Sequence, residues 1–139
     1  YEVSNWARPG GECRHNEIYW VDGNWWGAGP GAHSHVVDTR FHNVKHPATY
    51  ARAVAEGGLP LAGGEMLTRQ DRHTERIMLG LRLARGIPRE WLSGRADAAV
   101  ADFTARGLLE TVDGRLRVTD AGRLLADGIV TDLLIAEED

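Results

Sequence analysis

The chain has 139 residues, of which 42% are hydrophobic and 26% charged, the balance of a soluble globular domain of ordinary size or of a small domain with an appendage. A formal net charge of −4 argues against nucleic acid as a partner, because nucleic-acid-binding surfaces are usually basic. No apolar run approaches the ~20 residues of a membrane-spanning helix. A single cysteine, Cys13, excludes an internal disulfide and a cluster held by this chain's thiolates alone.

The first residue is Tyr1, inside a strand-like run, and no signal peptide opens the chain, so we expect a fragment or a processed chain. The first half is predicted to form short elements separated by turns. In chain order these are a strand at Tyr1–Trp6, a turn at Arg8–Gly11, a helix at His15–Val21, a strand at Trp25–Ala28, a loop at Gly29–Ser34 and a helix at Pro47–Glu56.

The second half has clearer signals. Thr68-Arg-Gln-Asp71 fits a helix-capping sequence, and the helix is expected to run to about Arg85 with Ile77, Met78 and Leu81 on one face. After a short turn at Arg89–Leu92, Ser93 is expected to cap a helix over Arg95–Arg106 that Gly107 ends. Thr119 is expected to cap a last helix in which Ala121, Leu125, Ile129 and Leu133 recur every four residues.

Between those helices, Leu108–Val118 is predicted to form a β-hairpin, since Asp113-Gly114 is the strongest two-residue turn signal. This turn pairs Val112 with Arg115, Thr111 with Leu116, Glu110 with Arg117 and Leu109 with Val118. One face then carries Leu109, Leu116, Val118 and the Thr111 methyl group, and the other a Glu110–Arg117 ion pair.

The domain boundary is predicted in the turn-rich stretch Gly57–Gly64, which separates residues 1–67 from 68–139. The predicted fold class is α+β, and the helices, hairpin and closing helix of residues 68–139 predict a winged-helix-like domain. In such a domain the helix Arg95–Arg106 would read DNA, but Asp97 and Asp102 balance its two terminal arginines. A scaffold role is therefore favoured over DNA binding.

The run Arg14–Trp20 is the most distinctive motif. His15 is a candidate axial ligand for haem iron, and in a helix Tyr19 shares its face and could pack on a porphyrin ring. The alternative is a histidine that hydrogen-bonds to the backbone while the aromatic residues fill a core. From spacing alone this structural alternative is favoured.

Two further groups have open interpretations. The glycine-rich run Gly27–Ser34 is either a plain turn or a loop that lets the backbone approach a ligand. The histidines after it fit no zinc spacing, so a structural or solvated role is favoured over a metal site. These histidines are His33, His35, His42 and His46.

Three segments in order carry a family resemblance: Tyr1–Trp20, the Gly-x-Gly-x-Gly-Ala-His-Ser run at Gly27–Ser34, and Glu75–Ile87. The chain resembles the HemW-like family, whose members are often described as oxygen-independent coproporphyrinogen III oxidase-like. The resemblance covers nearly the whole chain. Pro30 replaces a small residue, and Trp6, Trp25 and Trp26 replace the more usual Phe or Tyr.

The resemblance implies a radical S-adenosylmethionine barrel, whose last strands and helices would form residues 1–67, followed by the winged-helix-like domain. A CxxxCxxC motif, absent here, would hold a [4Fe–4S] cluster in the full-length protein only, so this chain alone is not expected to be catalytic. The family's proposed haem motif, HNxxYW, falls on His15, Asn16, Tyr19 and Trp20, with His15 as the iron ligand. Gly29, Gly31 and Ala32 fall near the S-adenosylmethionine pocket.

Two functions stay open. One is a cytoplasmic chaperone that binds haem and delivers it to recipient haemoproteins, which the HNxxYW motif favours. The other is an oxidase that decarboxylates coproporphyrinogen III in porphyrin synthesis. A winged-helix DNA-binding domain is a weaker alternative. The oligomeric state and the recipient haemoprotein cannot be deduced from the sequence.

Overall fold

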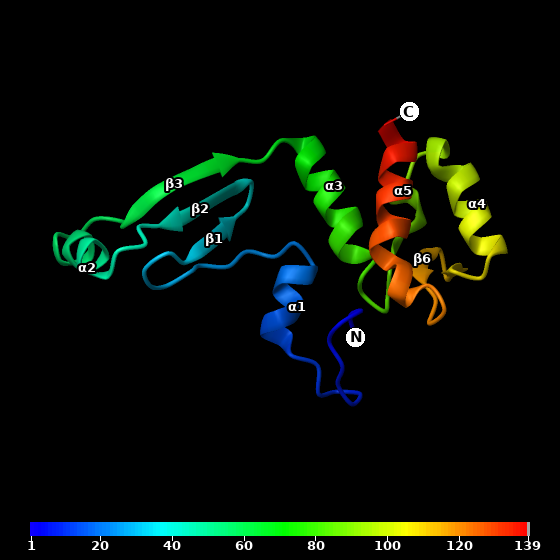
Figure 1. The fold of residues 1–139 in the computed structure, drawn as a ribbon, viewed down its shortest axis with the longest axis horizontal. Coiled ribbons are helices and arrows are strands. Elements are labelled where there is room, and N and C mark those ends of the chain that lie inside the picture. The colour runs from blue at the N-terminus through cyan, green and yellow to red at the C-terminus, as the bar shows by residue number, and fades with distance from the viewer. Residues whose placement is uncertain (139) are drawn as a thin grey trace. The chain divides into compact units, whose positions relative to one another are not determined.

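The computed structural model describes residues 1–138 and divides the chain into two compact units (Figure 1). The helical unit combines Tyr1–Val21 with His73–Asp139, and the meander unit comprises Asp22–Arg72. This division differs from the boundary predicted at residue 67, because the first 21 residues pack on the C-terminal half. The assignment of residues 1–67 to the end of a barrel stays a prediction.

The meander unit is a three-stranded antiparallel sheet with one helix. Strand order is β1 (His33–Val36), β2 (Thr39–Asn43), β3 (Leu61–Met66), and α2 (Pro47–Ala55) lies between β2 and β3 in the chain. The helix agrees with the prediction, with Pro47 at its first turn and Gly57 at φ +76° beyond its end. The strand predicted at Trp25–Ala28 is wrong, since only Trp25 makes a single bridge, to His35.

None of β1, β2 and β3 was predicted: the expected loop Gly29–Ser34 ends at Ala32, where β1 begins with His33, and Gly63 and Gly64 lie in β3 rather than in a linker turn. The register of β2 and β3 explains why glycine occupies these positions. Gly64 lies opposite Phe41, and a Cβ atom on it would come within 2.7 Å of the Arg40 carbonyl oxygen. Glycine is therefore needed here for close approach of two strands, a use that composition alone cannot distinguish from a turn.

The helical unit contains the remaining elements. Its helices are α1 (Arg14–Trp20), most of α3 (Arg69–Gly80), α4 (Asp97–Ala105) and α5 (Ala126–Glu138); its strands are β4 (Ile87–Pro88), β5 (Leu109–Val112) and β6 (Arg115–Val118); its 3₁₀ turns are Arg89–Trp91, Gly94–Ala96 and Arg123–Leu125. The strands form a sheet in the order β4-β6-β5. The winged-helix description of this unit stays a prediction.

The predicted hairpin is confirmed residue by residue. All four expected pairs are present, from Leu109–Val118 to Val112–Arg115, and Asp113 and Gly114 form the turn at φ +50° and +75°. The Glu110 carboxylate accepts a hydrogen bond from Arg117 at 2.7 Å. Thr111 is the exception, because it is exposed and adds no methyl group to the buried face.

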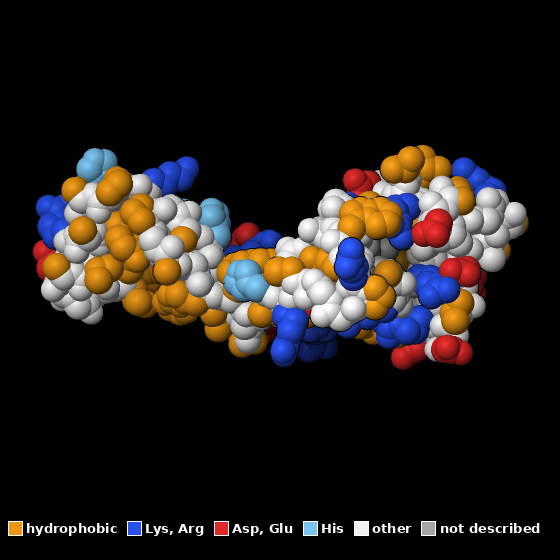
Figure 2. Space-filling view, turned by 90° about the horizontal axis from the view of Figure 1, so that it is seen from below, with side chains coloured by type: hydrophobic (Ala, Val, Ile, Leu, Met, Phe, Trp, Pro, Cys, Tyr) orange, Lys and Arg blue, Asp and Glu red, His pale blue; other side chains and the backbone are white. Residues whose placement is uncertain are grey.

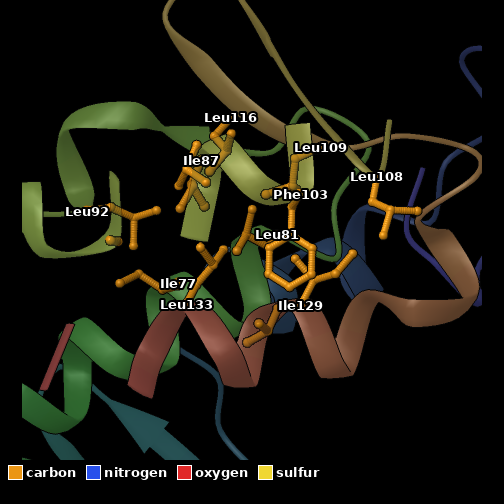
Figure 3. Packing of buried hydrophobic residues seen from close by; sticks show 13 residues of the cluster. Ile77, Leu81, Ile87, Leu92, Phe103, Leu108, Leu109, Leu116, Ile129 and Leu133 are labelled. Atoms are coloured by element: carbon orange, nitrogen blue, oxygen red, sulfur yellow. The ribbon is translucent and has the colours of Figure 1, made fainter. Parts of the chain in front are cut away.

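One hydrophobic cluster holds the helical unit together (Figure 3). It draws on α3, β4, α4, the β5–β6 hairpin and α5, so each α-helix and strand of the C-terminal half contributes at least one side chain. The largest of its fully buried members are Ile77, Leu81, Ile87, Leu109, Leu116, Ile129 and Leu133. Hydrophobic burial of this extent is what fixes the helices against the hairpin.

Several predicted boundaries in this unit are wrong. α3 ends at Gly80 rather than near Arg85, since the chain turns toward β4 through Gly86 at φ +60°. Met78 is 41% exposed and does not share the buried face of Ile77 and Leu81. The last helix begins at Ala126, so the expected Ala121 and Leu125 positions lie outside it and are exposed.

Two of the three predicted caps are present. The Asp71 amide donates to the Thr68 hydroxyl at 3.1 Å, and that hydroxyl donates to the Asp71 carboxylate at 2.7 Å. The Ser93 hydroxyl accepts from the Arg95 amide at the 3₁₀ turn that leads into α4. The Thr119 hydroxyl accepts from the Gly122 amide in a turn and does not cap α5, which begins only at Ala126. The Thr68 and Ser93 side chains satisfy backbone donors that a helix end leaves free.

At the chain start, the strand predicted over Tyr1–Trp6 reduces to one bridge between Glu2 and Leu83. The predicted turn at Arg8–Gly11 is confirmed by the Gly11 amide donating to the Arg8 carbonyl at 2.8 Å. Throughout residues 1–138, no helix is long and apolar enough to span a bilayer.

Candidate functional site

The HNxxYW motif forms α1, a helix of seven residues that the sequence placed within one residue of its observed ends. The helix starts when the Glu17 amide donates to the Cys13 carbonyl at 2.9 Å. It stops beyond Val21, where Asp22 adopts φ +57°. Helical geometry places residues four apart on one face, so His15 and Tyr19 are neighbours as predicted.

The side chains of His15 and Tyr19 contact each other. The Tyr19 hydroxyl lies 3.2 Å from His15 Nε2, within hydrogen-bond distance, and the rings meet edge to face at 5.4 Å. His15 is exposed, and Tyr19 is half-buried. The imidazole is thus held by its neighbour's side chain rather than by the backbone, and the histidine stays accessible to a ligand from solvent.

The other two motif residues anchor α1 to the rest of the helical unit. The Asn16 side-chain amide donates to the Tyr1 hydroxyl at 3.2 Å. The Arg82 guanidinium lies over the Trp20 ring, 5.1 Å from its centroid, a cation–π contact. Trp20 Nε1 is buried and has no hydrogen-bond partner among the described residues. Asn16 and Trp20 are therefore in a position to fix the helix, while His15 faces outward.

Arg82 connects three parts of this unit. Besides its contact with Trp20, it donates to the Glu2 carboxylate at 2.8 Å and to the Asp127 carboxylate at 2.6 Å. Backbone bonds reinforce the link, since the Val3 amide donates to the Arg82 carbonyl at 3.0 Å. The segment that carries the motif is thus held against α3 and α5.

Burial raises the pKa of Glu2, but hydrogen bonds from Asn5, Ser4 and Arg82 outweigh it and hold this pKa below its ordinary value. The carboxylate is therefore ionised at neutral pH and pairs with Arg82. Neither Glu2 nor Arg82 was singled out from the sequence. They lie 80 positions apart, and no local pattern links them.

The glycine loop of the meander unit holds itself together through its backbone. The Gly29 amide donates to the Tyr50 hydroxyl at 3.1 Å, the Gly31 amide to the Val44 carbonyl at 2.9 Å, and the Ala32 amide to the Gly29 carbonyl at 3.3 Å. Gly29 and Gly31 need glycine, since their φ angles are +107° and +69°. The loop's amides are engaged within the unit, and the Gly29 and Ala32 carbonyl groups accept hydrogen bonds from Asn43.

The four histidines of this unit do not form one cluster. His35 is buried, with Nε2 at 2.9 Å from the Val37 carbonyl oxygen and Nδ1 at 3.7 Å from Asp22. His33 and His42 stack on each other with ring centroids 5.2 Å apart. His46 precedes α2 and is exposed. Within residues 1–138, no three or more His, Cys, Asp or Glu side chains converge as a metal-binding group.

The arginines of the predicted DNA-reading helix are paired. Arg106 donates to Asp102 at 3.1 Å, and Arg95 donates to the Glu137 carbonyl at 3.3 Å. The Asp97 carboxylate of this helix accepts from Arg89, which lies in the preceding 3₁₀ turn. Charge on this face is balanced within the unit. This pairing weakens any attraction for phosphate groups.

Comparison with known proteins agrees with the family resemblance seen in the sequence. The family model described as the HemN C-terminal domain matches residues 67–125. The chain is 53% identical to the heme chaperone HemW of Mycobacterium tuberculosis (strain ATCC 25618 / H37Rv) over 96% of its own length and 34% of the relative's. It is 30% identical to HemW of Bacillus subtilis (strain 168), over 93% of this chain and 36% of that protein.

The fold also has a solved counterpart. The coproporphyrinogen III oxidase HemN from Escherichia coli, a radical SAM enzyme, aligns with 81% of this chain and 28% of its own, with a TM-score of 0.59 and 24% identity. The chain spans about a third of the length of the curated relatives it matches. On the high identity to HemW proteins across nearly all of its residues, together with the HemN-type domain, the chain belongs to the HemW-like family.

Proposed function

We propose that this chain is the C-terminal part of a radical SAM haem chaperone, and that α1 presents His15 as an axial ligand to the iron of a haem cargo. The observation that carries the proposal is the exposed imidazole of His15 beside the Tyr19 ring, on a helix that Asn16 and Trp20 anchor. Iron accepts a neutral imidazole nitrogen, and an adjacent aromatic ring supplies apolar area for a porphyrin.

Ligation requires a small local change. Nε2 is the nitrogen that faces the Tyr19 hydroxyl, so iron can bind it only after that contact opens. The cost is small, since a hydrogen bond between exposed neutral groups contributes about 0.5–1.5 kcal/mol. The Tyr19 ring would then pack against the porphyrin, while Trp20 stays under Arg82.

The full-length protein, in this proposal, supplies the barrel, the three cluster cysteines and S-adenosylmethionine. Within the chain, Cys13 is the one cysteine, so the [4Fe–4S] ligand set has to come from elsewhere. Gly29, Gly31 and Ala32 would border the S-adenosylmethionine pocket, where the absence of side chains on the two glycines lets the backbone approach a ligand closely. The winged-helix description of residues 68–139, the barrel that precedes it, a cytoplasmic location and delivery to recipient haemoproteins belong to the same proposal.

The oxidase alternative has weaker support. The similar protein with this activity is the Escherichia coli coproporphyrinogen III oxidase, and at 24% identity it shows a common fold alone. The relatives at 30% identity and above that cover most of the chain are named as heme chaperones.

The test is a haem titration of the full-length protein followed by absorbance in the Soret region. His15→Ala should shift the band and weaken binding at least tenfold, because the iron loses its nitrogen ligand. His46→Ala is the matched control, since His46 is also exposed at the start of a helix, and it should titrate like the wild type. If His15→Ala binds like the wild type while His42→Ala loses the band, the assignment of the iron ligand to α1 is wrong.

A further inference from the structure

His33 and His42 lie side by side on one face of the meander unit. They are directly opposite each other in the β1–β2 register. The next pair along the ladder, Ala32 with Asn43, is a hydrogen-bonded pair, since the Asn43 amide donates to the Ala32 carbonyl at 2.9 Å. Because hydrogen-bonded and non-hydrogen-bonded pairs alternate, His33 and His42 form a non-hydrogen-bonded pair, in which opposite side chains come closest.

The two imidazoles are already nearly parallel. Their centroids are 5.2 Å apart and their planes differ by 26°. Both side chains reach solvent, since His33 is exposed and His42 is half-exposed (Figure 2 shows histidines on the surface of the part formed by α2 and β1–β3). Neither ring nitrogen has a hydrogen bond to another described residue, unlike those of buried His35.

Glycines leave room around the pair. Gly63 lies opposite His42 on the next strand, and a Cβ atom there would come within 3.2 Å of His42 Cε1. The surface beside the pair is hollowed, with a volume of about 480 Å³ lined by His33, Arg40, Phe41, His42, Gly64 and Glu65. The imidazoles can therefore rotate and accept a hydrated ion without displacing another side chain.

Charge beside the pair is balanced. Arg40 and Glu65 are also opposite each other in register, and their side chains form an ion pair at 3.0 Å. The arginine therefore presents no uncompensated charge that would repel a cation. The donor set itself selects the metal, since imidazole nitrogen suits Zn²⁺, Cu²⁺ and Ni²⁺ and not the hard oxygen-seeking cations Mg²⁺ and Ca²⁺.

We propose that His33 and His42 form a two-histidine binding site for a divalent transition-metal ion of the Zn²⁺, Ni²⁺ and Cu²⁺ class. Metal–nitrogen distances of ~2.0–2.1 Å in a tetrahedral site separate two ligand nitrogens by ~3.3 Å, which small rotations of the two rings can reach. Among residues 1–138 no third protein ligand joins them, so water completes the coordination sphere. The site is independent of haem binding at α1.

The experiment is titration of the full chain with Cu²⁺, followed by electron paramagnetic resonance, and with Ni²⁺ by calorimetry. The copper spectrum of the wild type should show coupling to two imidazole nitrogens. His33→Ala and His42→Ala should each reduce this to one nitrogen and weaken Ni²⁺ binding at least tenfold, because the chelate is lost. His42→Gln, which keeps the size of the side chain, guards against a folding defect.

Two controls address other sites. His46→Ala removes an exposed histidine of the same unit, and His15→Ala removes the one beside Cys13. Both should leave the two-nitrogen signal and the Ni²⁺ affinity unchanged. The proposal is overturned if the signal survives in both His33→Ala and His42→Ala, or if His15→Ala abolishes it.

Discussion

Replacing Tyr19 by Phe separates the two things that this residue does beside His15. The substitution keeps the ring and its edge-to-face contact at 5.4 Å, and removes the hydroxyl that lies 3.2 Å from His15 Nε2. In the wild type, iron can bind Nε2 only after this hydrogen bond breaks, which costs about 0.5–1.5 kcal/mol of the free energy of binding. The Phe variant does not have this cost. If His15 ligates haem iron through Nε2, Tyr19→Phe should therefore bind haem about two- to tenfold more tightly.

The assay is a Soret titration of the full-length protein, with dissociation constants compared among the wild type, Tyr19→Phe and His15→Ala. Tyr50→Phe is a matched control, since it also deletes one hydroxyl that has a hydrogen-bond partner, the Gly29 amide, but in the meander unit. Its affinity for haem should equal that of the wild type. A Tyr19→Phe protein that loses the band would refute the reasoning, because the phenol oxygen would then be the ligand.

Two further predictions concern stability. Leu116 is fully buried in the hairpin, so Leu116→Ala should lower the free energy of unfolding by ~2–5 kcal/mol in denaturant titrations. Thr111, its cross-strand partner, is exposed, so Thr111→Ala should change the free energy of unfolding by less than ~0.5 kcal/mol, and equal effects would mean that Leu116 is not buried. Glu2→Gln should cost about 1.5–3 kcal/mol at neutral pH. Because the folded-state pKa of Glu2 is lowered, its contribution to stability is present above its ordinary pKa of about 4.5 and is lost as pH falls through the folded-state pKa. The melting temperatures of the wild type and the variant should therefore converge in acid. A difference in melting temperature that does not depend on pH would contradict this.

Elements with a strong local signal were predictable. The Asp113-Gly114 turn set the register of the hairpin, and the alternation of Leu109 and Leu116 agreed with it. The Thr68 cap, the Pro47 start of α2 and the α1 helix depend on side chains within a few residues of each other. In each case a neighbouring residue satisfies or removes a backbone donor, so the information is local.

Contacts between distant residues could not be predicted. Tyr1–Val21 belongs to the helical unit because Glu2 and Trp20 contact Arg82, more than 60 positions away in the chain. The sequence placed the HNxxYW motif on a helix, but it gave no signal that this helix packs on the C-terminal half of the chain. Tryptophan and histidine are concentrated in the first half of the chain. This composition indicates which side chains could bind a ligand, but it does not indicate which segments pack together.

The pairing of His33 with His42 shows why the histidine group could not be interpreted from spacing. Its register depends on a two-residue turn between Val36 and Thr39, where Val37 adopts φ +56°. A β-branched residue is disfavoured there, so no sequence rule points to a turn. The conformation is held from outside: the Val37 amide donates to the Asn24 side chain at 2.7 Å, and its carbonyl accepts from Arg72.

A change of one residue in this turn would move His42 to the opposite face of the sheet and leave His33 without its neighbour. The two-histidine site therefore depends on the contacts of Asn24 and Arg72 with the turn as much as on the histidines themselves. The sequence shows that several histidines lie close together in the chain. The β1–β2 turn determines which two of them lie opposite each other and could bind one ion. The same holds for α1, where the motif supplies the imidazole and Arg82, through Trp20, holds the helix that presents it.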